Sequence, residues 1–197
     1  MNRTLLPLGL VLSAALASCT PAMQSGTLPN LSDLVSARNA SATLLDPSGM
    51  PAGTATFTAK ADGVQIKVNV TGLKAGMHGM HIHENANCTD STDASGNKVV
   101  FGAAGAHFDP TYSHKHGAPD ALPSQGHGGD LPMISVGADG KGSADFFTNR
   151  LSLSGDNSVL SRSIIIHAAP DDYKTDPSGN SGARERCGVI APPQNDG

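Results

Sequence analysis

The chain has 197 residues and a formal net charge of −4 at pH 7, with eight histidines, 23 glycines, 13 prolines and no tryptophan. This length fits one compact domain, and the acidic balance lacks the basic excess that binds a nucleic-acid backbone, so we expect no nucleic-acid partner. Eight histidines beside only two tyrosines and five phenylalanines indicate imidazoles placed for metal coordination.

The N-terminal region predicts export. Arg3 is followed by an apolar run, residues 5–16, which is too short to span a bilayer but has the length of the apolar part of a secretory signal peptide. We expect residues 1–18 to be a signal peptide, residues 19–38 a flexible tether and residues 39–197 the folded domain.

The end of the apolar run predicts a lipid anchor. Leu16-Ala17-Ser18-Cys19 resembles a bacterial lipoprotein box, in which the cysteine is lipidated and holds the protein on a membrane of the cell envelope. Ordinary cleavage after Ala17 is the alternative and would leave Cys19 as a free thiol. We favour the anchor, because a leftover cysteine in an exported protein otherwise requires a partner.

Two cysteines remain when Cys19 is set aside. Cys88 and Cys187 form an even pair in a chain that we expect to reach an oxidising compartment, which predicts one disulfide. Two buried free thiols are the alternative, and export disfavours them. Closing a loop of about a hundred residues stabilises a fold by about 4–5 kcal/mol in the chain-entropy model.

Short strands separated by turn residues dominate the rest of the chain. Residues 64–70 alternate strictly between apolar and polar side chains, which is typical of a strand with one face on a core. Asp139-Gly140 favours a hairpin turn, because glycine tolerates a positive φ. No stretch has the pattern of an amphipathic helix, so we predict an all-β fold, an antiparallel sandwich or barrel. The other predicted strands are 52–58, the neighbourhood of Ile82, 133–136, 143–148, 163–167 and 188–191.

Two long stretches do not fit strands, residues 84–131 and 170–186, and loops of this length in a compact domain are usually functional. A strand just before the first stretch carries His81 and His83. In a strand these two side chains project from the same side, about 6.6 Å apart, while His78 points to the other side. The pair can share a metal ion only if the segment is extended, since residues two apart lie on different faces of a helix. Two histidines placed on a polar strand face by chance are the alternative.

The first long stretch holds a second candidate metal set. Three neutral imidazoles and one carboxylate complete a tetrahedral zinc site, and the binding energy of zinc would order so polar a loop. Solvated loop histidines are the alternative for each residue alone, but that reading does not account for all four together. The residues are His107, His116, His127 and Asp130.

These motifs resemble those of the copper/zinc superoxide dismutases, in particular their bacterial exported branch. The resemblance implies a Greek-key antiparallel β-sandwich or barrel of immunoglobulin-like architecture, with long metal-binding and electrostatic loops. The matching segments, in family order, are G-M-H-G-M-H-I-H-E at 76–84, A-H-F-D-P at 106–110, K-H-G-A-P at 115–119, H-G-G-D-L at 127–131, I-I-H at 165–167 and G-N-S-G-A-R-E-R-C-G-V-I at 179–190.

The resemblance also implies the metal ligands, with one copper ion and one zinc ion per subunit. His107 would bridge the two ions, binding copper through one ring nitrogen and zinc through the other. The implied copper ligands are His81, His83, His107 and His167, and the implied zinc ligands are His107, His116, His127 and Asp130.

Further roles come from the resemblance. Arg184 would hold the superoxide anion beside copper, and local positive charge can raise the on-rate of an anion by about 10–10³-fold. Asp171 would bond one copper histidine and one zinc histidine, with Asp172 as the neighbouring alternative. Three other residues are of interest. His78 would tie its strand to neighbouring backbone, His114 could replace His116 as a ligand, and Arg186 stands where a small apolar residue is usual.

The implied activity is the conversion of two superoxide anions to dioxygen and hydrogen peroxide, with copper alternating between Cu(II) and Cu(I), in protection of the cell envelope. A copper and zinc storage or delivery protein on the same scaffold is the alternative. A domain that kept only zinc is a second alternative, which the four histidines at the copper positions disfavour. A homodimer is compatible with the resemblance, but dimer contacts differ between branches of the family.

Overall fold

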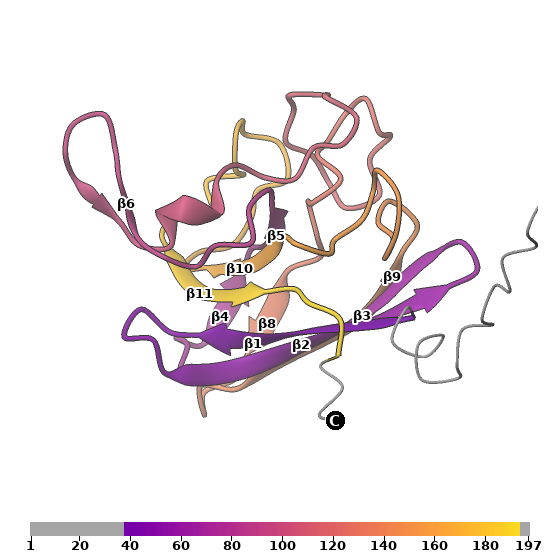
Figure 1. Cartoon of the computed structure of the whole chain (residues 1–197). Helices are drawn as coiled ribbons and strands as arrows, with labels where there is room; N and C mark the ends of the chain where they lie inside the picture. The colour runs from indigo at the N-terminus through magenta and orange to yellow at the C-terminus, as the bar shows by residue number, and fades with distance from the viewer. Residues whose placement is uncertain (1–37, 194–197) are drawn as a thin grey trace, which may run out of the picture.

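The computed structural model describes residues 38–193. The expected signal peptide, most of the expected tether and Cys19 therefore lie outside the described residues. Within the described range the regular structure is made of β-strands, together with one short 3-10 helix, η1 (Gly102–Ala104) (Figure 1). The all-β prediction is confirmed. Residues 38–193 contain no helix that is long and apolar enough to cross a membrane.

Nine of the strands form one antiparallel sheet in the order β4-β8-β9-β3-β2-β1-β11-β10-β5, and β6 and β7 form a separate hairpin. Figure 1 shows β10 and β11 above β1, β2 and β3, with the long loops gathered at the top. The strands are β1 (Asn39–Leu45), β2 (Pro51–Lys60), β3 (Gly63–Val70), β4 (Gly76–His78), β5 (Met80–His83), β6 (Ser91–Thr92), β7 (Lys98–Val99), β8 (Ile134–Val136), β9 (Gly142–Thr148), β10 (Ser163–His167) and β11 (Arg184–Val189).

The two end strands of the sheet are neighbours along the chain. Only Gly79 separates β4 from β5. Its N–H donates to the carbonyl of Ala169, and its carbonyl accepts the N–H of His167, so the junction is held against the end of β10. The sheet therefore curls into a nearly closed antiparallel barrel.

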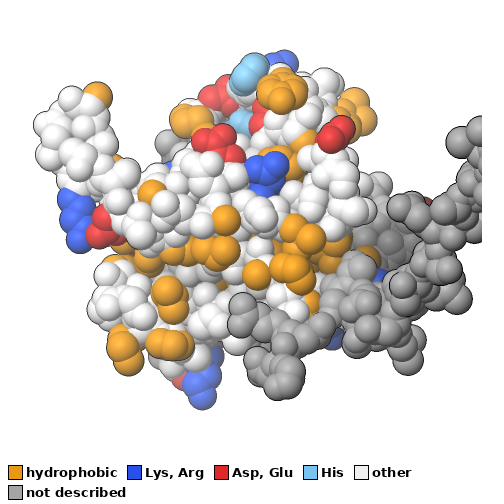
Figure 2. All heavy atoms as spheres, in the orientation of Figure 1, with side chains coloured by type: hydrophobic (Ala, Val, Ile, Leu, Met, Phe, Trp, Pro, Cys, Tyr) orange, Lys and Arg blue, Asp and Glu red, His pale blue; other side chains and the backbone are white. Residues whose placement is uncertain are grey.

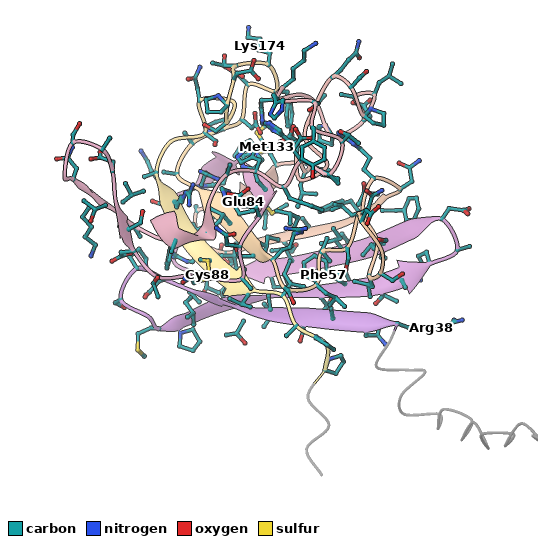
Figure 3. All side chains as sticks on the ribbon, turned by 45° about the horizontal axis from the view of Figure 1, so that its top comes forward. Arg38, Phe57, Glu84, Cys88, Met133 and Lys174 are labelled. Atoms are coloured by element: carbon teal, nitrogen blue, oxygen red, sulfur yellow. A yellow bond between two sulfur atoms is a disulfide. The ribbon has the colours of Figure 1, made fainter. Side chains whose placement is uncertain are left out.

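The barrel interior holds the main hydrophobic core. The alternation predicted for residues 64–70 is confirmed in β3, where Val64, Ile66, Val68 and Val70 are buried. Burying one such side chain contributes about 1.5–3 kcal/mol relative to leaving it exposed. Phe57 of β2 is fully buried in the same core (Figure 3).

Several strand boundaries differ from the prediction. β1 was not predicted, because two of its three buried side chains are alanines, which give little hydrophobic contrast. β11 begins at Arg184 and ends at Val189, so the predicted range of 188–191 was wrong. Arg186 is buried within this strand, and its guanidinium donates to the carbonyls of Thr71 and Gly72. The β6–β7 hairpin also falls in a stretch where no strand was predicted.

The predicted hairpin turn and the predicted disulfide are both confirmed. β8 pairs with β9 across the turn, where Gly140 has a φ of 74°. Cys88 is bonded to Cys187 of β11, with the two Cα atoms 5.7 Å apart. A small second core packs around this bond, made of Phe101, Ala104, Ile165 and Cys187 with the partly buried Cys88 and Val100.

Candidate metal centre

Two neighbouring strands and one loop bring the predicted ligands together. His81 and His83 lie on β5, and His167 is the last residue of β10, which pairs with β5. The loop extends this edge of the sheet, because isolated bridges join His83 to His107 and His81 to Asp130. The loop histidine His107 thus reaches the strand histidines through backbone pairing.

The first set consists of four buried histidines. His81, His83, His107 and His167 each offer a ring nitrogen, and these nitrogens lie within 4.8 Å of one another. The shared orientation predicted for His81 and His83 is therefore confirmed. The four side chains are at most 6% exposed. Figure 2 shows only a little histidine surface on this face of the molecule, near the loops at the top.

Hydrogen bonds fix which nitrogen of each ring faces the centre. His81 Nε2 donates to Asp171 Oδ2 over 2.7 Å, His83 Nδ1 to the carbonyl of Gly105 over 2.9 Å, and His167 Nδ1 to the carbonyl of Gly182 over 3.1 Å. The opposite nitrogens, His81 Nδ1, His83 Nε2 and His167 Nε2, have no hydrogen-bond partner, and neither has His107 Nε2. A ring that donates from one nitrogen presents a lone pair at the other.

These unpartnered nitrogens show that the residues fit a metal ion. A buried polar atom without a partner is costly, so four of them in one place require an explanation. A metal ion bound by these four imidazole nitrogens, which lie within 4.8 Å of one another, would supply it, since this donor set suits copper.

The second set is built around one carboxylate oxygen. Asp130 Oδ1 lies 3.0 Å from His107 Nδ1, 3.1 Å from His116 Nδ1 and 3.2 Å from His127 Nδ1. Ligands about 2.0–2.1 Å from a tetrahedral zinc ion are about 3.3 Å apart, so the three distances from Asp130 Oδ1 fit zinc. The group whose donor atoms all lie within 4.8 Å of one another contains His81, His107, His116 and Asp130, and His127 joins it only through Asp130. The other oxygen, Oδ2, accepts the backbone N–H groups of Gly117 and His127, which orients the carboxylate.

His107 belongs to both sets. Its unpartnered Nε2 faces the first set and its Nδ1 faces Asp130 in the second. Asp171 joins the sets a second time, because its Oδ2 accepts from His81 and its Oδ1 from His116 over 2.8 Å, with all three side chains fully buried. Asp172, the alternative to Asp171, binds only its own loop, through Thr175, Lys174 and Asn180.

Arg184 lies beside the first set. Its Nη1 donates to the carbonyl of Phe101 over 2.8 Å and its Nη2 to the carbonyl of Gly105 over 2.7 Å. Gly105 is also the acceptor for His83, so one carbonyl positions both side chains. The positive charge of Lys98 is not available to this site in the same way, because its ammonium group is paired with Asp90 over 2.7 Å in the β6–β7 hairpin.

The electrostatics of the two sets differ. Burial holds the pKa values of His83 and His167 well below 6.5 and lowers the pKa of His107 to about 3, although Asp130 acts in the opposite direction for His107. Burial also disfavours the charged form of His116, but Asp130 and Asp171 outweigh it and raise its pKa to about 9. Before metal binds, the first set is therefore neutral, and the second holds a proton beside its carboxylates.

The remaining predicted residues lie outside the two sets. His78 joins strand to backbone as expected, with Nδ1 2.7 Å from the carbonyl of His167 and Nε2 2.8 Å from that of Lys74. His114 is exposed and belongs to neither set. Two contributors were missed, the carbonyl of Gly105 and the carboxylate of Asp176, which accepts the backbone N–H of His116. A backbone acceptor, and a partner 60 residues away, leave no mark in the local sequence.

Comparisons with known proteins agree with this geometry. The family model described as copper/zinc superoxide dismutase matches residues 51–190. A Cu-Zn superoxide dismutase of Deinococcus radiodurans is 59% identical over 149 residues, which cover 76% of this chain and 82% of that protein. That of Photobacterium leiognathi is 38% identical over 145 residues, which cover 73% and 80%. The solved Cu/Zn superoxide dismutase from Brucella abortus superposes with a TM-score of 0.68 at 34% identity, covering 77% of this chain and 98% of that one.

An antiparallel barrel with two adjoining groups of buried side chains that could each hold a metal ion defines the class as a metalloprotein, and the family match makes it an oxidoreductase. The chain belongs to the copper/zinc superoxide dismutase family. Its cofactors are accordingly copper and zinc.

Proposed function

We propose that this protein converts two superoxide anions and two protons to dioxygen and hydrogen peroxide, outside the cytoplasm, with one copper and one zinc ion per subunit. The observation that carries the proposal is the convergence of four buried imidazole nitrogens with no hydrogen-bond partner, beside a carboxylate that three further ring nitrogens approach. Family membership supports the same activity.

The proposed ligand atoms follow from the hydrogen bonds. Copper, when bound, supplies one-electron redox chemistry, and zinc, which has none, fixes His107 in place. The copper ligands are His81 Nδ1, His83 Nε2, His107 Nε2 and His167 Nε2. The zinc ligands are His107 Nδ1, His116 Nδ1, His127 Nδ1 and Asp130 Oδ1.

Two side chains act on the substrate in this proposal. Arg184 binds the superoxide anion, because its guanidinium is held at the rim of the copper set by the carbonyls of Phe101 and Gly105. When His107 Nε2 is not bound to copper, it is the atom that would hold a proton for transfer to the product, since it is the ring nitrogen that faces the copper set. Asp171 orients one ligand of each set and touches neither substrate nor product.

We also propose that the protein is exported and anchored by lipid at Cys19, after removal of residues 1–18, with residues 19–38 as the tether. The disulfide between Cys88 and Cys187 supports an oxidising compartment. The intact mass of the mature protein tests the anchor, because acylation adds hydrocarbon and plain cleavage does not. Pairing into a homodimer stays a prediction that light scattering of the mature domain would check.

Replacing Arg184 separates the enzyme from a storage or delivery protein. We expect Arg184→Ala to lower the rate of superoxide consumption at low ionic strength by at least about tenfold while copper and zinc contents stay at the wild-type level. Arg184→Lys, which keeps the charge, should restore part of the rate.

Lys98→Ala is the matched control, because it removes one positive charge from the hairpin, where Lys98 is already paired with Asp90. Its rate should equal that of the wild type. A storage protein would show no change in any variant, and wild-type activity in Arg184→Ala would refute the proposed role of this residue.

A further inference from the structure

Arg150 lies two residues beyond the end of β9 and is bonded to the loop that carries the proposed zinc ligands. Its Nη2 donates to the carbonyl of Gly126 over 2.6 Å, and its Nη1 approaches the carbonyls of Ala118 and Pro119 at 3.4 and 3.5 Å. The side chain is half-buried, and its Nε is buried without a partner. The guanidinium therefore joins two separate loop segments to the barrel.

Those two segments are the ones that carry proposed zinc ligands. Ala118 and Pro119 follow His116 closely, and Gly126 directly precedes His127. The segments also touch each other, because a Cβ atom on Gly117 would lie 2.4 Å from the carbonyl oxygen of Gln125 and 3.1 Å from Cα of Gly126. Only glycine at position 117 allows this approach.

Asp130 holds the same pair of segments from the metal side. Its Oδ2 accepts the N–H of Gly117 from one segment and the N–H of His127 from the other. Arg150 and Asp130 therefore both form hydrogen bonds to the same two loop segments, at the place where these segments touch. Arg150 is anchored beside a barrel strand, whereas Asp130 is itself a proposed ligand.

We propose that Arg150 is a positioning residue for zinc, which holds the segments of His116 and His127 close to their binding geometry before the metal arrives. A guanidinium suits this role, because its donors form a rigid fork that can reach several carbonyls at once. A loop that is already ordered loses less conformational entropy when it binds an ion. The proposal rests on the zinc ligand set given above.

Loss of the Arg150 guanidinium should weaken the binding of zinc and leave the binding of copper unchanged. The copper set takes three of its four histidines, His81, His83 and His167, from strands β5 and β10. None of the three carbonyls that Arg150 contacts lies in those strands. Removing the guanidinium should therefore loosen the second set and leave the first in place.

The test compares Arg150→Met and Arg150→Lys with the wild-type protein loaded with both metals. The measurement is the rate at which zinc passes to a chromogenic chelator. We expect Arg150→Met to release zinc about tenfold faster, the lower end of what loss of an outer partner costs a metal site. The rate of zinc release from Arg150→Lys should lie between those of the wild type and Arg150→Met, since an ammonium group reaches fewer acceptors. The visible absorption of bound copper should not change.

Arg186→Lys is the matched control. Arg186 also donates to three carbonyls, those of Glu185, Thr71 and Gly72, and its Nε is likewise buried without a partner. The loop acceptors of Arg186 lie just after the end of β3. Arg150 lies near the opposite end of β3, because it follows β9, whose last residue pairs with the start of β3. We expect Arg186→Lys to lower the melting temperature and to release zinc at the wild-type rate.

The outcomes separate the possibilities. Wild-type zinc release from Arg150→Met and Arg150→Lys would overturn the proposal, and so would equally fast release from Arg186→Lys, which would indicate general loosening. Should Arg150→Met fail to fold, hydrogen exchange in the metal-free wild type and in metal-free Arg150→Lys decides, since the amides of Gly117 and His127 must be protected in the wild type and exchange faster in the variant. Exchange at the rate of an unfolded chain would overturn the proposal. Failure of the wild type to bind zinc would refute the ligand set instead.

Discussion

Replacing Asp171 by asparagine should weaken the binding of at least one of the two metals. The carboxylate accepts one imidazole N–H from His81 and one from His116, at 2.7 and 2.8 Å, in a fully buried site. Asparagine keeps one acceptor oxygen and places an NH₂ group against the second imidazole. The loss of one hydrogen bond to a charged group costs about 1.5–3 kcal/mol, which corresponds to about a 10- to 150-fold change in affinity.

Competition with chelators of known affinity would measure this effect for copper and for zinc separately. Outer partners of metal ligands typically contribute about 10–100-fold to affinity, which agrees with the estimate from hydrogen bonding. Asp172→Asn is the control, because the neighbouring carboxylate bonds only within its own loop and should leave both affinities unchanged. Unchanged affinity for both metals in Asp171→Asn, or an equal loss in Asp172→Asn, would refute the reasoning.

Three further results are expected. Reducing the bond between Cys88 and Cys187, which closes a sequence separation of 99 residues, should lower the free energy of unfolding in denaturant by about 4–5 kcal/mol, and an unchanged unfolding midpoint would contradict this. The metal-free protein should lose stability as the pH falls below 6.5, because His83 and His167 have lowered pKa values in the folded state and the unfolded chain then binds more protons. Thermal unfolding across pH 5–8 measures this loss of stability. A melting temperature that does not change with pH would contradict the prediction. The rate of superoxide consumption should fall as salt is raised from low ionic strength to about 0.1 M, where the screening length is about 10 Å, whereas the rate of Arg184→Ala should depend less on salt.

Much of the fold could be predicted from local patterns in the sequence. β3 could be predicted because its side chains alternate strictly, and β10 because an apolar run ends at a histidine. The start of β11 could not, because its first three residues, from Arg184 to Arg186, are charged and read as loop. Arg186 is tolerated in a buried strand only because carbonyls of Thr71 and Gly72, more than 110 residues away, accept its hydrogen bonds. These hydrogen bonds depend on the folded structure and could not be predicted from the sequence around Arg186.

The candidate site, like the fold, could be predicted from the sequence only in part. That His81 and His83 would share a side follows from the two-residue period of a strand. That His81 presents Nδ1 to the centre and His83 presents Nε2 does not follow from the sequence, because it depends on where Asp171 and the carbonyl of Gly105 lie. The choice of Asp171 over Asp172 was decided in the structure by the same kind of contact.

The β6–β7 hairpin stands away from the barrel, and residues 92–98 at its tip are exposed (Figure 1). Cys88 precedes this tip and Cys187 follows it, so proteolysis at the tip would yield two fragments that remain covalently linked. The upstream fragment would keep His81 and His83 and the downstream fragment the other ligands. A nicked molecule would thus persist as a two-chain protein in oxidising surroundings, and reductant would break this covalent link between its halves.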